Sequence, residues 1–369
     1  VAVIVMCLLP NAGSFGLTVS SAILVGLFAL MLLDTSINMA MQPFKMLVGD
    51  MVNERQKGLA YSIQSFLCNA GSIVGYVFPF ILTWIGFRNT AAAGVIPQTV
   101  VFSFYFGAAI LLLCVIYSLV KIKEWPPQTY AEYNGGASQN KTEEKTNLIK
   151  LLVKAPSTFW TVGLVQFFCW FAFMFMWTYT NGSIAANVFD APTVENTVNG
   201  ITKIVLDTKS LQYQEAANWV GVLFAVQAIG SVLWAICIPM FKDRRFIYAL
   251  SLVLGGIGFI STYFVHSPYV LFVSFLLIGC AWAAMLALPF TILTNALSGG
   301  HMGTYLGLFN GTICIPQIVA AALGGSILAL FTPEGMLPPE INMLVTAGVM
   351  LIIGAACVYL IKETKGERA

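Results

Sequence analysis

Long apolar segments separated by polar ones run along the whole chain. They lie near residues 20–48, 58–86, 99–120, 157–189, 217–241, 246–266, 269–297, 303–331 and 341–361. A helix of about 20 largely apolar residues crosses the hydrocarbon core of a bilayer. The pattern therefore predicts nine transmembrane helices and an all-α integral membrane fold.

Composition agrees with this prediction. Apolar residues make up 58% of the chain and charged residues 9%, and the mean hydropathy is +0.84. A soluble domain carries about 25% charged residues. The net charge of +2 gives no sign of nucleic-acid binding. The expected partners are the lipid bilayer and a small molecule.

The basic residues set the expected orientation. If the spans alternate, all but three of the 18 Lys and Arg residues fall on one side, the exceptions being Arg88, Lys203 and Lys209. By the positive-inside rule that side is cytoplasmic. We therefore expect a multi-pass protein of the plasma membrane, a bacterial inner membrane, with its C-terminus in the cytoplasm.

One long polar segment divides the chain. Residues 121–155 are rich in Pro, Gly, Ser and charge, which predicts a cytoplasmic linker with a short amphipathic helix at 146–154. Six spans follow it in 156–369, as in the second half of a twelve-span transporter. Residues 1–120 would then be the remainder of the N-terminal half, spans 3–6. On this interpretation the apolar residues 1–10, too short to cross, end the third span of a longer parent protein.

Cysteine and histidine give no sign of an enzyme or a metalloprotein. The eight Cys are spread about one per span, and the two His lie at span ends. Without a Cys/His cluster, metal binding is not expected. We expect no enzymatic activity, no metal and no cofactor, with a proton, or else sodium, as a coupling ion.

Asp34 is the carboxylate that lies deepest in an apolar segment. A charge at that depth costs about 2.5–3.5 kcal/mol and normally faces the bundle interior. Asn38 and Gln42 follow at intervals of four, on the same helix face. A carboxylate in an apolar interior without a counter-charge takes up and releases protons near neutral pH. Asp34 is therefore predicted to be a proton-coupling group, whereas Asn38 and Gln42 either bind substrate or form hydrogen bonds between helices.

The remaining spans are rich in amides and poor in charge. This pattern favours a neutral, polyhydroxylated ligand. Trp170 and Trp177 share a helix face with Gln166, and aromatic faces stack on sugar rings, although packing or lipid contact would explain them equally. Pro289 and Pro316 interrupt helical hydrogen bonding, which is tolerated at a cavity or hinge. The predicted substrate-binding residues are Asn38, Gln42, Gln64, Asn69, Gln166, Trp170, Trp177, Gln227, Asn310 and Gln317.

Two charged turns lie at the cytoplasmic ends of spans. Asp50 and Arg55 lie in the first, and Asp243 and Arg244 in the second. Both read equally as solvated loops or as a cytoplasmic gate. The polar residues 190–216, on the other side, are expected to form an exposed loop.

The stretch LLDTSINMAMQPFKMLVGDMVNERQKGLAYSIQSF, with GSIVGYVFPF after it, resembles the sucrose–proton symporter branch of the glycoside–pentoside–hexuronide:cation symporters. These belong to the major facilitator superfamily. The matching positions are Asp34, Asn38, Pro43, Asp50, Gly75 and Tyr76, and the segments around 281–297 and 315–317 also look like that family.

The resemblance implies a twelve-span major facilitator fold, with Asp34 as proton carrier and sugar bound between two six-helix halves. The expected function is sugar:proton symport of a disaccharide or glucoside by alternating access, by a monomer. Two alternatives stay open. One is transport of another neutral solute, such as a sodium-coupled glycoside or a nucleoside, and the other is a non-transporting sugar sensor.

Overall fold

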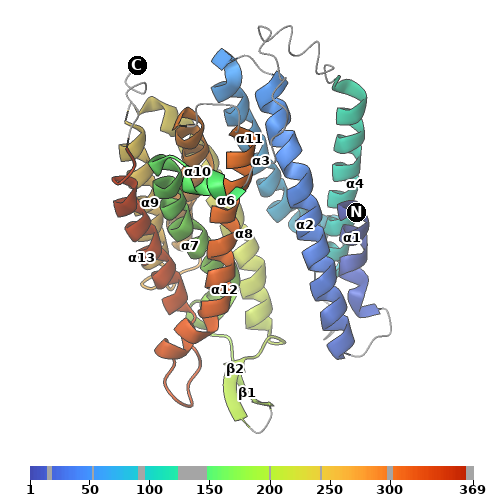
Figure 1. Ribbon diagram of the computed structural model, residues 1–369. Helices are drawn as coiled ribbons and strands as arrows, with labels where there is room; N and C mark the ends of the chain where they lie inside the picture. Colours follow the sequence, from blue (N-terminus) through green and yellow to red (C-terminus); the bar gives the residue numbers. More distant parts are fainter. Residues whose placement is uncertain are drawn as a thin grey trace. The chain divides into compact units, whose positions relative to one another are not determined.

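The computed structural model describes residues 1–14, 19–51, 54–89, 96–123, 148–198, 201–241, 243–296 and 302–362. Most of these residues are helical (Figure 1). Nine helical segments among them are long and apolar enough to cross a membrane. Each overlaps one of the nine predicted spans, so the predicted all-α membrane architecture is confirmed.

The first helices carry three of these spans. They are α1 (Ala2–Leu8) with a 3-10 helix (Leu9–Ser14), α2 (Val19–Met51), α3 (Glu54–Trp84), α4 (Gln98–Lys121) and the short α6 (Leu148–Val153). The last lies within the amphipathic helix expected at 146–154. The partial span expected at residues 1–10 is helical but is shorter than a full span.

Six spans follow α6. They are formed by α7 (Ser157–Asn187), α8 (Leu211–Cys237), α9 (Arg244–Ser261), α10 (Leu271–Ala296), α11 (Met302–Phe309) together with α12 (Gly311–Phe331), and α13 (Ile341–Val358). A short 3-10 helix, Ile238–Met240, ends α8. Asn310 separates α11 from α12, which share one apolar segment.

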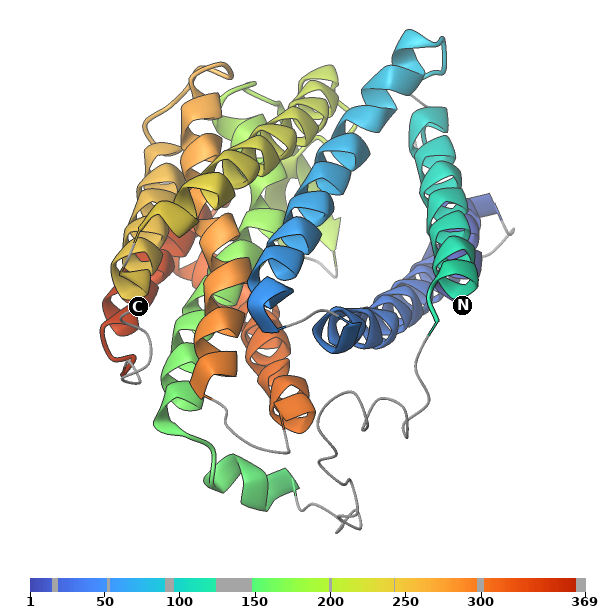
Figure 2. The same cartoon turned by 90° about the horizontal axis from the view of Figure 1, so that it is seen from above.

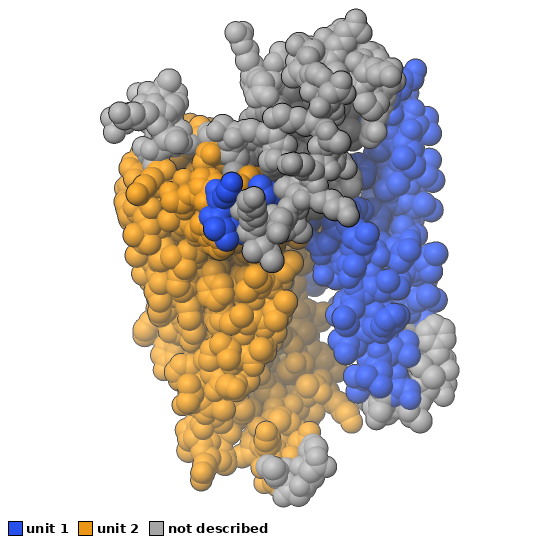
Figure 3. All heavy atoms as spheres, in the orientation of Figure 1, with its two compact units in different colours: residues 1–47, 78–154 blue, residues 48–77, 155–369 orange. Residues whose placement is uncertain are grey.

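By their internal contacts the residues form two compact units (Figure 3). One comprises residues 1–47 and 78–154, and the other residues 48–77 and 155–369. The boundary inside α3 has no counterpart in the sequence-based division into 1–120, 121–155 and 156–369, which stays a prediction.

In the first unit, α1 packs against α4. The Asn11 side-chain amide donates a hydrogen bond to the Tyr105 hydroxyl at 2.7 Å. Phe78, near the end of α3, stacks on Phe106 of α4 with ring centroids 4.2 Å apart. Aromatic and amide side chains thus join helices of this unit.

In the second unit, α7 to α13 form a helix bundle, seen end-on in Figure 2. Glycines bring its helices close together. A Cβ added at Gly230 of α8 would lie 2.6 Å from the Leu276 carbonyl oxygen of α10. One added at Gly256 of α9 would lie 2.9 Å from the Gly348 carbonyl oxygen of α13. Small residues at helix contacts are typical of membrane bundles because they let backbones approach.

Between α7 and α8, within the segment expected to be an exposed loop, the chain forms a β-hairpin. Strands β1 (Thr193–Val198) and β2 (Ile201–Leu206) pair antiparallel, with Thr193 opposite Leu206 and Val198 opposite Ile201. The Thr197 and Thr202 hydroxyls lie 2.9 Å apart across the strands. The hairpin projects from one end of the bundle, and α13 ends at the other (Figure 1).

Candidate functional site

A hollow in the second unit is the site with the most suitable chemistry. Four helices line it: α3, α7, α8 and α10. The lining residues are Asn69, Ser72, Tyr76, Met176, Trp177, Gln227, Ala228 and Trp282. The hollow holds about 300 Å³ of space not filled by atoms, part of which is open to solvent.

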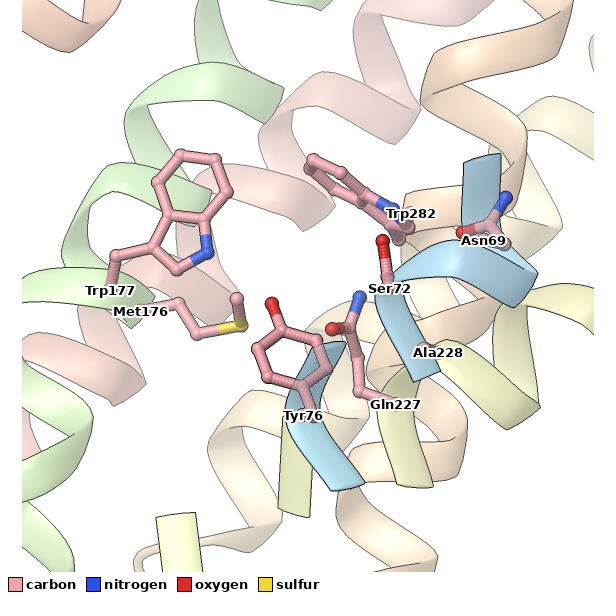
Figure 4. A pocket seen from close by; sticks show the side chains of 8 residues that line it. All are labelled: Asn69, Ser72, Tyr76, Met176, Trp177, Gln227, Ala228 and Trp282. Carbon is pink, nitrogen blue, oxygen red and sulfur yellow. The ribbon is translucent and has the colours of Figure 1, made fainter. Parts of the chain in front are cut away.

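The polar groups converge on one space (Figure 4). The Tyr76 hydroxyl, the Ser72 hydroxyl and the Gln227 amide point into the hollow beside Trp282, and Trp177 faces them from the other side. None of the eight lining residues carries a charge. Together they present hydroxyl, amide and indole groups to one space.

Helical spacing explains why α3 contributes Asn69, Ser72 and Tyr76 to the same hollow. They lie three and four residues apart on α3 and therefore share one face. Asn69 is buried, and its Oδ1 accepts a hydrogen bond from the Ser231 hydroxyl of α8 at 3.2 Å. Ser231 stands one turn after Gln227 on α8. The bond thus fixes the polar face of α3 beside the Gln227 side of the hollow.

A cluster of aromatic rings borders the hollow. Trp282 of α10 contacts Trp177 and Trp170 of α7, with ring centroids 5.8 Å apart in both pairs and interplanar angles of 81° and 75°. Phe173 lies 4.9 Å from Trp282. Edge-to-face contacts of this kind are favourable for aromatic rings. They hold two indoles nearly perpendicular at the edge of the hollow.

The chemistry of the hollow suits a small neutral ligand with several hydroxyl groups. Amide and hydroxyl side chains both donate and accept hydrogen bonds. The enclosed volume of the hollow is about 40 Å³, which is far smaller than the roughly 300–1,000 Å³ of usual ligand pockets. An anionic or cationic ligand would find no counter-charge among the lining residues.

Three of the predicted binding residues, Asn69, Trp177 and Gln227, meet in this hollow. Sequence reasoning did not single out the other lining residues, Ser72, Tyr76, Met176, Ala228 and Trp282, for binding. Ser72 and Tyr76 had a usable signal, since they lie three and seven residues after Asn69 on the same face. Trp282 had no such signal in the sequence, because the direction in which its side chain points depends on how α10 packs.

Other predicted binding residues lie elsewhere in the same unit. Gln166 and Trp170 are buried between helices. Gln64 of α3 and Gln317 of α12 are half-buried outside the lining. The Asn310 amide lies 3.9 Å from the Cys314 sulfur at the start of α12.

Asp34 and Asn38 lie on α2, in the first unit. Asp34 is exposed, and its backbone carbonyl accepts a hydrogen bond from the Asn38 amide at 2.9 Å. Gln42 is on the same helix, but its side chain lies outside the described residues. In the described spans Asp34 is the one carboxylate in the interior of an apolar segment, since Glu215 lies near the start of α8.

The predicted gate is described only in part. The side chains of Asp50 and Arg55 fall outside the described residues. Asp243 is the N-cap of α9, and its Oδ1 accepts from the backbone N–H groups of Arg245 and Phe246 at 2.9 and 3.0 Å. This is the usual role of Asp before a helix. Arg244 is half-buried, and a gating role for these residues stays a prediction.

The fold and the site define a class: a polytopic α-helical membrane protein with an uncharged hollow in a helix bundle. No protein-family model matches the chain. Solved structures do. A variant of the fucose:proton symporter FucP of E. coli is similar with a TM-score of 0.58, at 15% identity over 98% of this chain and 83% of that one.

Two further structures agree. FucP, a major facilitator superfamily transporter, in its outward conformation gives a TM-score of 0.60 at 15% identity, over 98% of this chain and 81% of that one. A bacterial homolog of the human lysosomal transporter Spinster, in an inward-facing and occupied conformation, gives a TM-score of 0.50. Its sequence identity is 16%, over 98% of this chain and 81% of that one. At such low identity these likenesses establish the fold. The chain has the major facilitator fold.

Proposed function

We propose that the protein is a secondary active transporter that moves a small neutral sugar, a disaccharide or glucoside, in symport with protons. Transport would proceed by alternating access. The fold supports this proposal at the level of class, because FucP, a fucose:proton symporter, has a similar fold. Folds host many functions, so the specific proposal depends on the site.

The hollow is the observation that carries the proposal. Hydroxyl and amide groups of Tyr76, Ser72 and Gln227 point into one space beside the Trp282 ring. Sugars present hydroxyl groups and apolar ring faces at the same time, so they need both kinds of partner. A site built to bond ligand hydroxyls discriminates strongly against ligands that lack them.

Asp34 is the proposed proton carrier. It is the carboxylate in the middle of the apolar segment Ser21–Met41. Intramembrane carboxylates of this kind mark proton pathways in transporters because keeping them charged in lipid is costly. Asn38 and Gln42, on the same face of α2, would stand beside the proton site.

Uptake into proteoliposomes tests the proposal. The purified protein is reconstituted, a proton gradient is imposed, and radiolabelled disaccharides and glucosides are screened. Asp34→Asn is expected to lower proton-driven accumulation at least about tenfold, and Gln227→Leu to raise KM by a similar factor, since each removes one functional group. Glu195→Gln on the exposed β1 and Gln212→Leu at the exposed start of α8 are matched controls.

The outcomes separate the alternatives. Undiminished accumulation by Asp34→Asn would exclude that residue as the proton carrier. Accumulation driven by a sodium gradient but not by a proton gradient would identify sodium as the coupling ion. Sugar binding without accumulation would identify a sensor on the same scaffold.

We propose a monomer in a bacterial inner membrane, with the C-terminus in the cytoplasm and with neither metal nor organic cofactor. The positively charged turns support that orientation.

A further inference from the structure

Pro289 breaks the backbone hydrogen bonding of α10 at a buried position. It lies inside the helix Leu271–Ala296. Proline has no N–H group, so the usual bond to the carbonyl four residues earlier cannot form. That carbonyl belongs to Met285, whose side chain is fully buried. In an apolar interior the Met285 carbonyl needs another donor.

Gln166 of α7 supplies that donor. Its Nε2 lies 3.0 Å from the Met285 carbonyl oxygen, and the residue is completely buried. The Gln166 Oε1 has no hydrogen-bond partner among the described residues. The side chain therefore contributes one donated bond, directed at the carbonyl that Pro289 leaves free.

The bond lies one helical turn from the hollow. Trp282, which lines the hollow, precedes Met285 by three residues on α10. Trp170 follows Gln166 by four residues on α7 and packs edge-on against Trp282 at 5.8 Å. Two adjacent contacts thus tie α7 to α10: the amide–carbonyl bond and the pair of indoles.

We propose that Gln166 is a positioning residue for Trp282. By holding the Met285 carbonyl, it fixes the segment of α10 that presents Trp282 to the hollow, although Gln166 itself does not line it. The same bond fixes Trp170 against Trp282 from the α7 side. The effect on transport rests on the proposed function, in which the hollow binds the substrate.

Restoring the missing backbone donor makes a sharp test. In Pro289→Ala the N–H of residue 289 is able to bond the Met285 carbonyl, so Gln166 is no longer required there. Gln166→Met is similar in size but has no donor. It should therefore displace Trp282 when residue 289 is proline, and leave Trp282 in place in Pro289→Ala. Pro316→Ala, which restores a helical bond in α12, is the matched control.

The position of Trp282 is read by fluorine NMR of protein labelled with 5-fluorotryptophan, which gives one resonance for each of the eight Trp. Trp282→Phe assigns the resonance. We expect Gln166→Met to shift or broaden it while the Trp219 resonance, from a ring that is hydrogen-bonded to Pro268, stays in place. The Gln166→Met/Pro289→Ala double variant should return the Trp282 resonance to its position in Pro289→Ala.

An unchanged Trp282 resonance in Gln166→Met, or equal rescue by Pro316→Ala, would overturn the proposal. If Gln166→Met does not accumulate in the membrane, recovery of accumulation in the double variant supports the coupling, and its failure contradicts it.

Transport supplies the second readout. Gln166→Met is expected to raise the uptake KM roughly 3- to 10-fold with little change in kcat, and Pro289→Ala to suppress that rise. A normal uptake KM together with a shifted Trp282 resonance would show that the Gln166 bond is only structural. That result would reject the positioning role. If no variant and no wild-type protein transports any solute while the NMR coupling holds, the proposed function fails and the link between Gln166 and Trp282 stands.

Discussion

Glu340 lies immediately before α13 and packs against α7. A Cβ added at Gly182 of α7 would overlap its carboxylate, so the absence of a side chain there makes room for it. Burial raises the pKa of Glu340 to about 7. Its environment therefore favours the protonated form, in contrast to an ordinary surface glutamate.

This pKa predicts a pH-dependent stability. Because the folded protein holds the Glu340 proton more tightly than the unfolded chain does, the folded state is favoured at low pH. That advantage is lost as the pH rises from the ordinary value of 4.5 through about 7. Above pH 7 the charged carboxylate destabilises the fold by an amount on the order of 2 kcal/mol, allowing for its partial exposure.

Glu340→Gln should remove the charge and with it most of this pH dependence. Thermal unfolding in detergent, measured from about pH 5 to about pH 8, is expected to show a falling Tm for the wild type and a flatter one for the variant. Glu334→Gln, an exposed carboxylate in the same connection, is the control. Parallel curves for wild type and Glu340→Gln would contradict the prediction.

Sequence reasoning found the amides of the hollow and Trp177, but not Tyr76 or Trp282. Asn69 and Gln227 stand out because a polar side chain in an apolar span needs a partner. Trp282 and Tyr76 do not, since aromatic residues make up 13% of this chain and most of them pack or meet lipid. Which rings face a cavity is decided by helix packing.

At the scale of the helix, the crossing of α8 and α10 depends on Gly279. A Cβ added there would lie 2.7 Å from the Ser231 backbone nitrogen and would also meet the Gln227 carbonyl oxygen. Both atoms are backbone and cannot move without shifting α8. Because Gln227 lines the hollow, the crossing also sets the geometry of the site.

Gly279→Ala is therefore expected to destabilise the protein, although alanine is the better helix former by about 1 kcal/mol. Overpacking of this kind costs about 1–3 kcal/mol. Gly325→Ala on α12, where an added Cβ meets nothing within 4 Å, should be neutral or stabilising. A thermal unfolding series compares the two, and equal Tm changes would show that the crossing tolerates a methyl group.

The hairpin shows what composition alone misses. Residues 190–216 are polar enough to suggest a loop, yet β1 and β2 consist largely of Val, Ile and Thr, which favour strands. In the sequence they are separated by Asn-Gly, a strong hairpin signal. The local pattern thus indicates a hairpin, whereas the overall polarity of residues 190–216 indicates only an exposed loop.

At the scale of the whole molecule, the spans were predictable because lipid allows few solutions. A chain that crosses a bilayer must satisfy its backbone hydrogen bonds internally, so apolar length translates directly into helices. The grouping of residues 48–77 with the second unit was not predictable, since it depends on tertiary contacts.

The span count also predicts the sides on which exposed segments lie. Five spans separate the hairpin from the C-terminus: α8, α9, α10, α11 with α12, and α13. The two should therefore face opposite sides of the membrane. An epitope inserted between β1 and β2 is expected to bind antibody on intact spheroplasts, whereas a C-terminal epitope should require permeabilisation.

An epitope inserted in residues 124–147 is the control for this experiment. Six spans separate it from the C-terminus, so the two should behave alike. Labelling of the hairpin and the C-terminal epitopes under the same condition would show that one of these five spans does not cross.

The bond between Gln166 and the Met285 carbonyl has an evolutionary consequence. The Gln166 donor is needed only while residue 289 is proline. In turn, proline at 289 leaves the Met285 carbonyl satisfied only while residue 166 supplies a donor. Among homologues, a donor at position 166 and proline at 289 should be gained and lost together. Covariation between two positions 123 residues apart in the sequence would then record a single missing N–H group.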